Sequence, residues 1–344
     1  MTRWLSGYYE ENIIQAAEVI KRDGLVAFPT ETVYGLGANA LSKIAVAKIF
    51  EVKNRPDFDP LIVHISKKED IYLYAENINE DVEKLIQNFW PGPLTIVLPK
   101  KDIIPDIVTA GLRTVAIRMP SNSIALKLID YAGVPIAAPS ANPFGYISPT
   151  SAFQVAEMLN NKIDFILDGG KCQFGLESTV ITFQDNEVFL LRPGALEIER
   201  IERVLNKTVK FLEEKKILSP GQLDKHYSPH KKMILIYPVL ENEKINYTET
   251  VKKLEKVVEN IGDYNQIFLI LPSREFEVKK DKNFGRIEYL SDKMDYRVIS
   301  SNLFEKLYLA DKSEQGLIVV VGVVREGLGF SIMNRLQKAA DEKY

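Results

Sequence analysis

The residues of this chain that suggest chemistry are hydroxyls, glycines and cations placed where apolar strands end. F-P-T-E-T-V-Y-G-L-G-A-N runs from Phe28 to Asn39 directly after an apolar strand, and Lys53 and Arg55 follow soon after it. S-A-N-P begins much later at Ser140, and G-L-E-S-T begins at Gly175. Such groups can hold a polyanion such as a nucleoside triphosphate. A nucleotide enzyme is therefore the first hypothesis.

Lys53 and Arg55 are two residues apart where a predicted helix ends, so both side chains could face one cleft. Two cations in a cleft bind the phosphates of ATP and neutralise charge as pyrophosphate departs. The alternative is a pair of solvated cations favoured by the helix dipole. Both side chains are expected to be exposed, so truncating either one should leave the fold intact.

Three arginines lie at or beside apolar strands, namely Arg113, Arg118 and Arg192. An arginine in such a position either points to solvent or grips a carboxylate or phosphate in a polar pocket, and we favour the pocket. His64 ends an apolar strand and could donate a hydrogen bond to a small substrate, although a satisfied core histidine is as good an interpretation.

Two turns offer further anion-binding groups. Ser140 follows a buried strand, and Ser148 precedes a predicted helix, where it could instead cap that helix. Gly35, Gly37 and Gly175 are expected to allow positive φ or a close ligand approach. The chain has no G-x-x-x-x-G-K-[ST] sequence, which excludes a P-loop protein.

Composition indicates an ordinary soluble protein with room for two cores. The 344 residues are 46% apolar and 26% charged, with a net charge of -3 that provides no general attraction for nucleic acid. Apolar runs are shorter than a membrane span, and the start Met1-Thr2-Arg3-Trp4 does not resemble a signal peptide, so a cytoplasmic location is expected. The single cysteine, Cys172, is interpreted as structural.

Apolar periodicity predicts two α/β domains. In the first, residues 1–207, helical patterns cover 13–20 and 42–52, and the last two strands should form a hairpin turning at Gln184-Asp185-Asn186. In residues 208–232 the apolar period fails, and two prolines and a glycine predict an extended connector. Our hypothesis is that this connector lies over the active-site cleft. Residues 233–344 are predicted to form a smaller Rossmann-like parallel sheet. The expected strands of the first domain are 25–28, 61–65, 94–98, 114–119, 135–138, 165–167, 177–183 and 188–192, and those of the second are 233–237, 267–271, 287–290 and 317–324.

Seven ordered motifs between Phe28 and Gly194 resemble the YrdC-like family of threonylcarbamoyl-AMP synthases. They are F-P-T-E-T-V-Y-G-L-G, K-N-R-P with the later P-L, P-G-P-L-T, V-A-I-R-M-P, S-A-N-P-x-G, G-L-E-S-T-V and L-R-P-G. S-P-G-x(4)-H-Y-S-P and the second α/β domain resemble the long, two-domain form. The resemblance implies a twisted mixed-sheet YrdC-like domain followed by the smaller parallel-sheet domain.

The family resemblance implies an enzyme that makes L-threonylcarbamoyladenylate and pyrophosphate from L-threonine, ATP and bicarbonate or CO₂, for threonylcarbamoylation of tRNA. It implies Mg²⁺ held mainly by ATP phosphates, no metal ligand from the protein, and hand-over of the product to a tRNA-modifying transferase, without stable nucleic-acid binding. By the family pattern, the catalytic residues would be Lys53, Arg55 and Ser140. Those around threonine would be Thr32, His64, Arg118, Ala138 and Ser178. Those around ATP would be Arg55, Asp59, Thr114, Ser140, Asn142, Ser148, Arg192 and Tyr227.

Two alternatives remain at this stage. The same cleft could bind RNA through phosphate contacts without catalysis, although the net negative charge opposes this. A carbamoyltransferase of the hydrogenase-maturation type would share the first domain. Such proteins resemble this chain only over that domain and add zinc-binding cysteine clusters, whereas this chain has one cysteine.

Overall fold

The computed structural model describes residues 1–212, 226–278 and 283–344, which form two compact units. The first unit comprises residues 1–144, 148–173 and 177–212, and the second comprises the remaining described residues. Two short loops, 145–147 and 174–176, belong to the second unit, although the sequence places both inside the predicted first domain. Most of the predicted connector, residues 213–225, lies outside the described residues.

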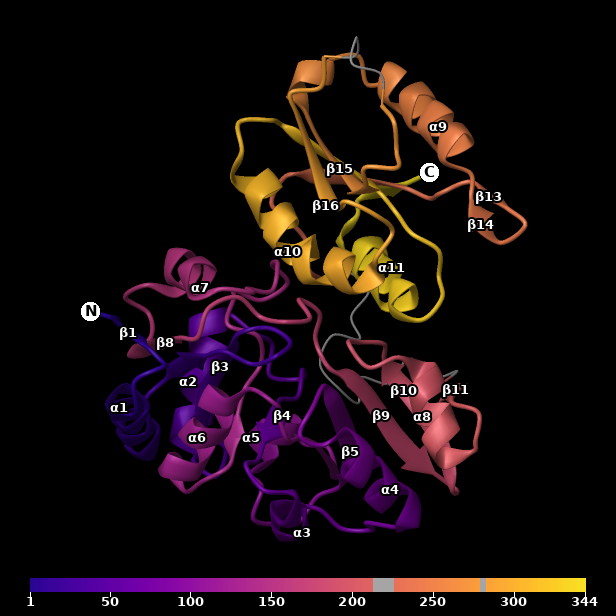
Figure 1. The fold of residues 1–344 in the computed structure, drawn as a ribbon. Helices are drawn as coiled ribbons and strands as arrows, with labels where there is room; N and C mark the ends of the chain where they lie inside the picture. The colour runs from indigo at the N-terminus through magenta and orange to yellow at the C-terminus, as the bar shows by residue number, and fades with distance from the viewer. Residues whose placement is uncertain (213–225, 279–282) are drawn as a thin grey trace. The chain divides into compact units, whose positions relative to one another are not determined.

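The first unit is built on one mixed sheet, which confirms the predicted fold class (Figure 1). Its strands, within the described residues, follow the order β1-β8-β2-β3-β7-β4-β6-β5-β9-β10-β11. The sheet is mixed because β4 pairs with β6 in parallel, whereas β5 pairs with β6 antiparallel. The strands are β1 (Arg3–Ser6), β2 (Val26–Phe28), β3 (Gly35–Asn39), β4 (Ile62–His64), β5 (Leu94–Pro99), β6 (Thr114–Arg118), β7 (Ile136–Ala137), β8 (Phe165–Asp168), β9 (Thr179–Gln184), β10 (Glu187–Arg192) and β11 (Lys210–Phe211).

Helices α1 and α6 lie side by side and bury their apolar faces against β2 and β8 (Figure 1). Ile13 and Ile20 of α1 share one core with Leu128 of α6 and Phe28 of β2, as the 3.6-residue period predicts. The helices of this unit are α1 (Glu10–Lys21), α2 (Lys43–Lys53), α3 (Ile71–Tyr74), α4 (Glu80–Phe89), α5 (Asp106–Thr109), α6 (Ser123–Ala132), α7 (Ala152–Leu159) and α8 (Ile198–Leu205), with a 3-10 turn at Lys68–Asp70.

The predicted hairpin is confirmed, whereas three strands of this unit, β1, β3 and β11, were not predicted. Strands β9 and β10 pair antiparallel, and Asp185 and Asn186 both have positive φ, as a tight two-residue turn requires. The segment Gly35–Asn39, which lies in none of the predicted strands, is strand β3 and pairs with β2. Glycine is needed at Gly37 for packing and not for positive φ, because a Cβ there would lie 2.7 Å from Phe28 Cε1.

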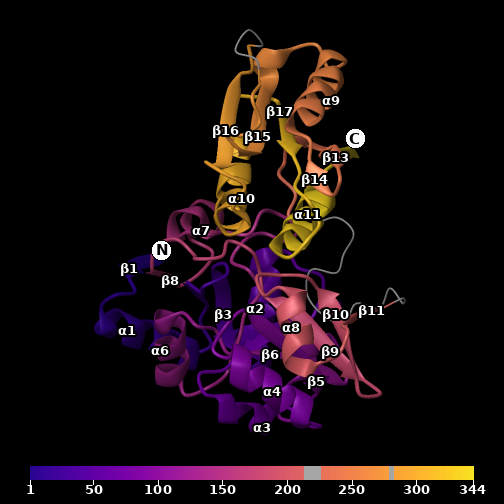
Figure 2. The ribbon, with the colours of Figure 1, turned by 45° about the vertical axis from the view of Figure 1, so that its right-hand side comes forward.

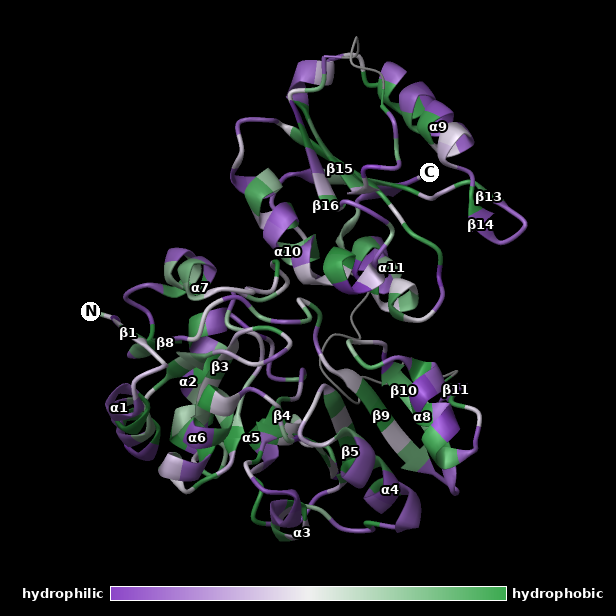
Figure 3. Ribbon diagram, in the orientation of Figure 1, coloured by the Kyte–Doolittle hydropathy of each residue, from purple (hydrophilic) through white to green (hydrophobic). Residues whose placement is uncertain are grey.

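The second unit contains the predicted parallel sheet, in the order β16-β15-β17-β12-β18. Strands β15, β16 and β17 run side by side in it (Figure 2). Strand β15 is hydrophobic along most of its length, while α9 has hydrophobic and hydrophilic positions, as expected for a central strand and a covering helix (Figure 3). The elements are β12 (Lys232–Ile236), β13 (Leu240–Glu241), β14 (Lys244–Ile245), α9 (Tyr247–Glu259), a 3-10 turn (Tyr264–Gln266), β15 (Ile267–Ser273), β16 (Arg286–Ser291), α10 (Tyr296–Lys312), β17 (Leu317–Val321), α11 (Leu328–Ala339) and β18 (Glu342–Lys343).

None of the helices in the described ranges combines the length and the apolar composition that crossing a membrane requires.

Candidate functional site

Three buried polar side chains form a row across neighbouring strands of the first unit. Arg118, the last residue of β6, is the register partner of His64 on β4 and of Thr95 on β5. Side chains of register partners project from the same face of a sheet. His64, Thr95 and Arg118 therefore line one face, and the predicted pocket position of Arg118 agrees with its burial.

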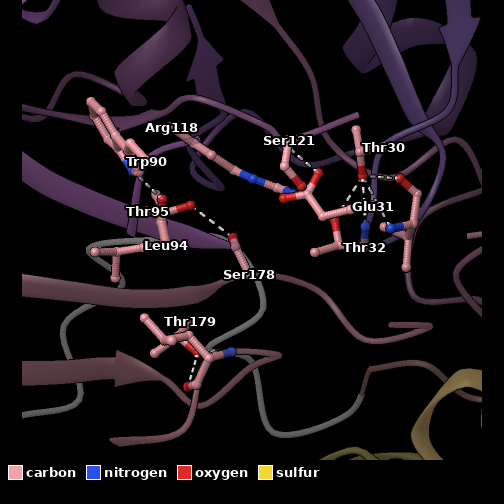
Figure 4. Close-up of polar contacts among 12 residues, drawn as sticks. Thr30, Glu31, Thr32, Trp90, Leu94, Thr95, Arg118, Ser121, Ser178 and Thr179 are labelled. Carbon is pink, nitrogen blue, oxygen red and sulfur yellow. Dashed lines mark hydrogen bonds and ion pairs between the residues drawn. The ribbon is translucent and has the colours of Figure 1, made fainter. Parts of the chain in front are cut away.

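Ser178 and Arg192 extend this row. The hydroxyl oxygens of Thr95 and Ser178 are 2.7 Å apart and point toward one another (Figure 4). Arg192 Nη2 donates to the carbonyl of Ser178 at 3.0 Å and to its hydroxyl at 3.2 Å. Gly194 makes this close approach possible, because a Cβ there would lie 2.3 Å from the carbonyl carbon of Ser178.

The loop between β2 and β3 supplies Thr30, Glu31 and Thr32 to the same place. Glu31 Oε1 accepts from Arg118 Nη2 at 2.7 Å, and Glu31 Oε2 accepts from the backbone N–H of Ser121 at 3.1 Å (Figure 4). The hydroxyls of Thr30 and Thr32 lie 2.8 Å apart. We call Thr30, Glu31, Thr32, His64, Thr95, Arg118, Ser178 and Arg192 the arginine group.

A second set of side chains surrounds Lys53, at the end of α2. Lys53 Nζ donates to the carbonyl of Ser140 at 2.6 Å and to the carbonyl of Asn142. The expectation that Lys53 and Arg55 are exposed is wrong, because their exposed fractions are 1% and 8%. Burial, with the nearby charge of Arg55, lowers the pKa of Lys53 well below its usual range.

Arg55 forms a buried ion pair with Asp59, 2.8 Å between Nη2 and Oδ2. Its Nε also donates to the Asp59 carbonyl at 3.0 Å, and Nη2 donates to the Pro60 carbonyl at 2.8 Å. Thr114 begins β6 two residues before Ala116, and Pro60 lies two residues before Ile62, which is the register partner of Ala116. We call Lys53, Arg55, Asp59, Thr114, Ser140 and Asn142 the lysine group.

Strands β4 and β6 connect the two groups. Arg118 and Thr114 are at opposite ends of β6, roughly 13 Å apart at 3.3 Å per residue. Ala138 N donates to the Ile62 carbonyl at 2.9 Å, so the segment from Ala138 to Asn142 runs from β4 toward Lys53. The predicted threonine residues Thr32, His64, Arg118 and Ser178 therefore lie in one group, and most predicted ATP residues lie in the other.

The remaining predicted residues have other surroundings. Ser148 donates to Glu177 Oε1 at 2.6 Å. Tyr227 lies in the second unit, where it is buried with positive φ against Phe304 and 5.0 Å below the Arg335 guanidinium. Its closure over a nucleotide stays a prediction.

One pocket prediction is wrong, and one structural interpretation agrees with the geometry. Arg113 is exposed. It lies just before β6, where its carbonyl accepts from the Lys100 N–H at 2.9 Å. Cys172 is buried, and burial raises the pKa of its thiol, which keeps it protonated and unreactive.

Glu31, Thr95 and Glu177 were missed as site residues. Each stands inside a motif that was quoted from the sequence, T-E-T, P-G-P-L-T and L-E-S-T. For Glu31, a carboxylate between two threonines and next to a buried strand was the available signal, because such a group needs a buried partner.

The imidazole of His64 is expected to stay neutral at ordinary pH. Burial, aided by the charge of Arg118, lowers the pKa of His64 to about 3, from 6.5. The unfolded chain then binds more protons between about pH 3 and 6.5, so the stability that His64 contributes falls as the pH drops through that window. Proton NMR, with His64→Gln to assign the signal, should show no titration of this ring between about pH 5 and 8. An inflection near 6.5 would contradict this.

Comparison with known protein families finds two matching models. Residues 18–194 match the family described as "Telomere recombination", and residues 196–341 match "Threonylcarbamoyl-AMP synthase, C-terminal domain". Together they account for most of the chain.

Curated relatives have similar length and share the name threonylcarbamoyl-AMP synthase. The protein of Pyrococcus abyssi is 42% identical over 94% of this chain and 93% of its own length. That of Bacillus subtilis is 38% identical over 96% of this chain and 93% of its own length.

Solved structures include one that covers both units. The crystal structure of P. abyssi Sua5 complexed with L-threonine has a TM-score of 0.87 and 39% identity, and covers 100% of this chain and 99% of that one. Escherichia coli YciO, with a TM-score of 0.52 and 24% identity, covers 56% of this chain and 96% of its own, and shows the fold alone.

Proposed function

Because the chain belongs to the threonylcarbamoyl-AMP synthase family, we propose that it makes L-threonylcarbamoyladenylate and pyrophosphate from L-threonine, ATP and bicarbonate or CO₂, for tRNA modification. It is a nucleotidyltransferase-type enzyme with a YrdC-like domain. The observation that carries the proposal is the division of buried polar residues between the arginine group and the lysine group. The arginine group suits a small zwitterion, and the lysine group suits a polyphosphate.

The arginine group is proposed to bind threonine. Arg118 offers a charged fork for the substrate carboxylate, while Thr32, neutral His64 and Ser178 offer hydrogen bonds to its amine and hydroxyl. A site that hydrogen-bonds a substrate hydroxyl discriminates against analogues that lack it, because its own polar groups then stay unsatisfied. Ala138 would line this pocket without adding charge.

The lysine group is proposed to bind ATP. Nζ of Lys53 contacts two carbonyls and forms no ion pair with any carboxylate in the described ranges. An arriving phosphate would favour the ammonium form of this buried amine. The proposed ATP contacts are Arg55, Asp59, Thr114, Ser140, Asn142, Ser148, Arg192 and Tyr227, of which Arg192 belongs to the arginine group and Tyr227 to the second unit. Lys53, Arg55 and Ser140 are proposed to lie nearest the reacting phosphate.

The proposed reaction has two steps. The unprotonated amine of threonine attacks carbon dioxide, an N–C bond forms, and the released proton leaves with solvent or bicarbonate. A carbamate oxygen then attacks the α-phosphorus of ATP, and the bond to the leaving pyrophosphate breaks. The protein's contribution is to orient the two substrates and neutralise the departing charge.

Mg²⁺ is proposed to arrive with ATP as part of that substrate. Across the described residues, no three His, Cys, Asp or Glu side chains gather as a metal site. Glu31 and Asp59, the carboxylates of the two groups, are each paired with an arginine. Phosphate oxygens and water are therefore the proposed ligands, which is a common arrangement for this ion.

Each part of the chain is proposed to have its own role. Residues 1–207 would carry catalysis, 208–232 would be the connector, and 233–344 a separate α/β domain whose role is left open. The product would be handed to a tRNA threonylcarbamoyltransferase in the cytoplasm. The family membership supports synthesis of the adenylate over an RNA-binding module and over a hydrogenase-maturation carbamoyltransferase.

Pyrophosphate release from ATP tests the proposed function. With the purified full chain, release should require both L-threonine and bicarbonate, and omission of either should reduce it to the background of ATP alone. Mass spectrometry should identify the adenylate as the second product. Release that is indifferent to threonine would overturn the proposal, and tight, salt-dependent RNA binding without turnover would favour the RNA-binding alternative.

A further inference from the structure

Glu31 is a buried carboxylate in the arginine group to which the proposed function assigns no role. Its exposed fraction is 4%, and both of its oxygens accept hydrogen bonds from groups fixed by the fold. Oε1 accepts from Arg118 Nη2 at 2.7 Å, and Oε2 accepts from the Ser121 N–H at 3.1 Å. The two donors lie at and just beyond the end of β6.

The turn that carries Glu31 is held by its own hydroxyls. Thr30 Oγ1 accepts from the backbone N–H of Thr32 at 3.1 Å and of Val33 at 3.2 Å, and donates to the Val33 carbonyl at 2.6 Å. These bonds fix the backbone on both sides of Glu31. Its side chain is therefore presented to Arg118 by a closed turn (Figure 4).

Arg118 is left with unused hydrogen-bonding capacity. Its Nη2 is engaged by Glu31, whereas its Nε is buried and has no hydrogen-bond partner among the described residues. A buried N–H donor without a partner is unfavourable, and an arriving acceptor relieves it. The guanidinium is planar, so holding one nitrogen fixes the direction of the others.

We propose that Glu31 is a positioning residue that holds Arg118 so that the Nε side of its guanidinium receives the substrate carboxylate. Glu31 also balances the charge of Arg118, so the free site contains a neutral pair and not an isolated buried cation. Glu31 thereby sets the preference for an amino acid with a free carboxylate. This inference rests on the proposed function, because it takes threonine as the ligand of the arginine group.

Calorimetric titration with two ligands tests this role. L-threonine carries the carboxylate, and L-threoninamide carries a neutral carboxamide in its place. Glu31→Gln should weaken threonine binding about tenfold or more and change threoninamide binding by less than about twofold. Glu31→Asp, which keeps the charge but shortens the reach, should give an intermediate loss for threonine. Glu11→Gln, an exposed glutamate on α1, is the matched control and should change neither.

Steady-state kinetics supplies an independent readout. In Glu31→Gln, KM for threonine should rise about as much as its Kd, while kcat and KM for ATP should stay within about threefold of the original values. A partly unfolded variant would weaken the binding of threonine and threoninamide by the same factor, so the ratio of the two Kd values still gives an answer.

Each other outcome overturns the inference. Equal losses for threonine and threoninamide would show a general structural role, and tighter threonine binding would show that Glu31 occupies the position of the carboxylate. Unchanged binding would show no role. These results apply if the original protein binds threonine; if it does not, the proposed function fails first and this inference fails with it.

Discussion

Lys53→Met is expected to lower pyrophosphate release by about 10²–10³-fold, the usual cost of removing one positioned charge-stabilising donor. Lys53 Nζ donates hydrogen bonds to the carbonyls of Ser140 and Asn142, and burial lowers the pKa of Lys53. A phosphate beside it would favour the ammonium, so the interaction grows as charge develops on the leaving pyrophosphate. The measurement is kcat and KM for ATP with threonine and bicarbonate saturating.

The fold should tolerate this change. Methionine keeps the length of the buried stem, and what is lost is a donor to two carbonyls, for a stability cost of about 1–3 kcal/mol. Lys43→Met, an exposed lysine in the first turn of the same helix, is the matched control and should keep full activity. If Lys53→Met kept more than about a tenth of the activity, Lys53 would have no role at the reacting phosphate.

Arg55→Ala is expected to remove both activity and stability. It leaves the Asp59 carboxylate, with an exposed fraction of 0%, without its 2.8 Å ion-pair partner. Removing one member of a buried pair typically costs about 3–5 kcal/mol. The free energy of unfolding, from urea denaturation, should fall by that amount. This replaces the sequence-based expectation that truncating an exposed cation would leave the fold unchanged.

A double variant separates the two roles of Arg55. Arg55→Leu combined with Asp59→Asn removes both charges, so most of the lost stability should return. Activity should not return, because the proposed phosphate-binding cation is still missing. A stable and fully active double variant would show that the pair is structural only, whereas an Arg55→Ala protein as stable as the original would contradict its burial.

Strand patterns were readable because buried strands need continuous apolar residues. The segments around Val26–Phe28, Leu94–Pro99 and Ile267–Ser273 were predicted almost to their ends. Strand β3, Gly35–Asn39, was not predicted. Its glycines allow close packing against Phe28, but in the sequence they resemble the glycines of a turn. Local propensity carries no information about such close contacts between side chains and the backbone of a paired strand.

The sequence alone determined the family, the α/β class and the identity of most site residues, because the motifs of glycines, hydroxyls and cations can be recognised in order along the chain. It did not determine which of those residues meet. Only the tertiary structure decided that Lys53 and Arg55 are buried, that Arg113 is exposed, and that Glu31 holds Arg118. The physical reason is strand register. His64, Thr95 and Arg118 are distant in the chain, and adjacent only because three strands align them in one row.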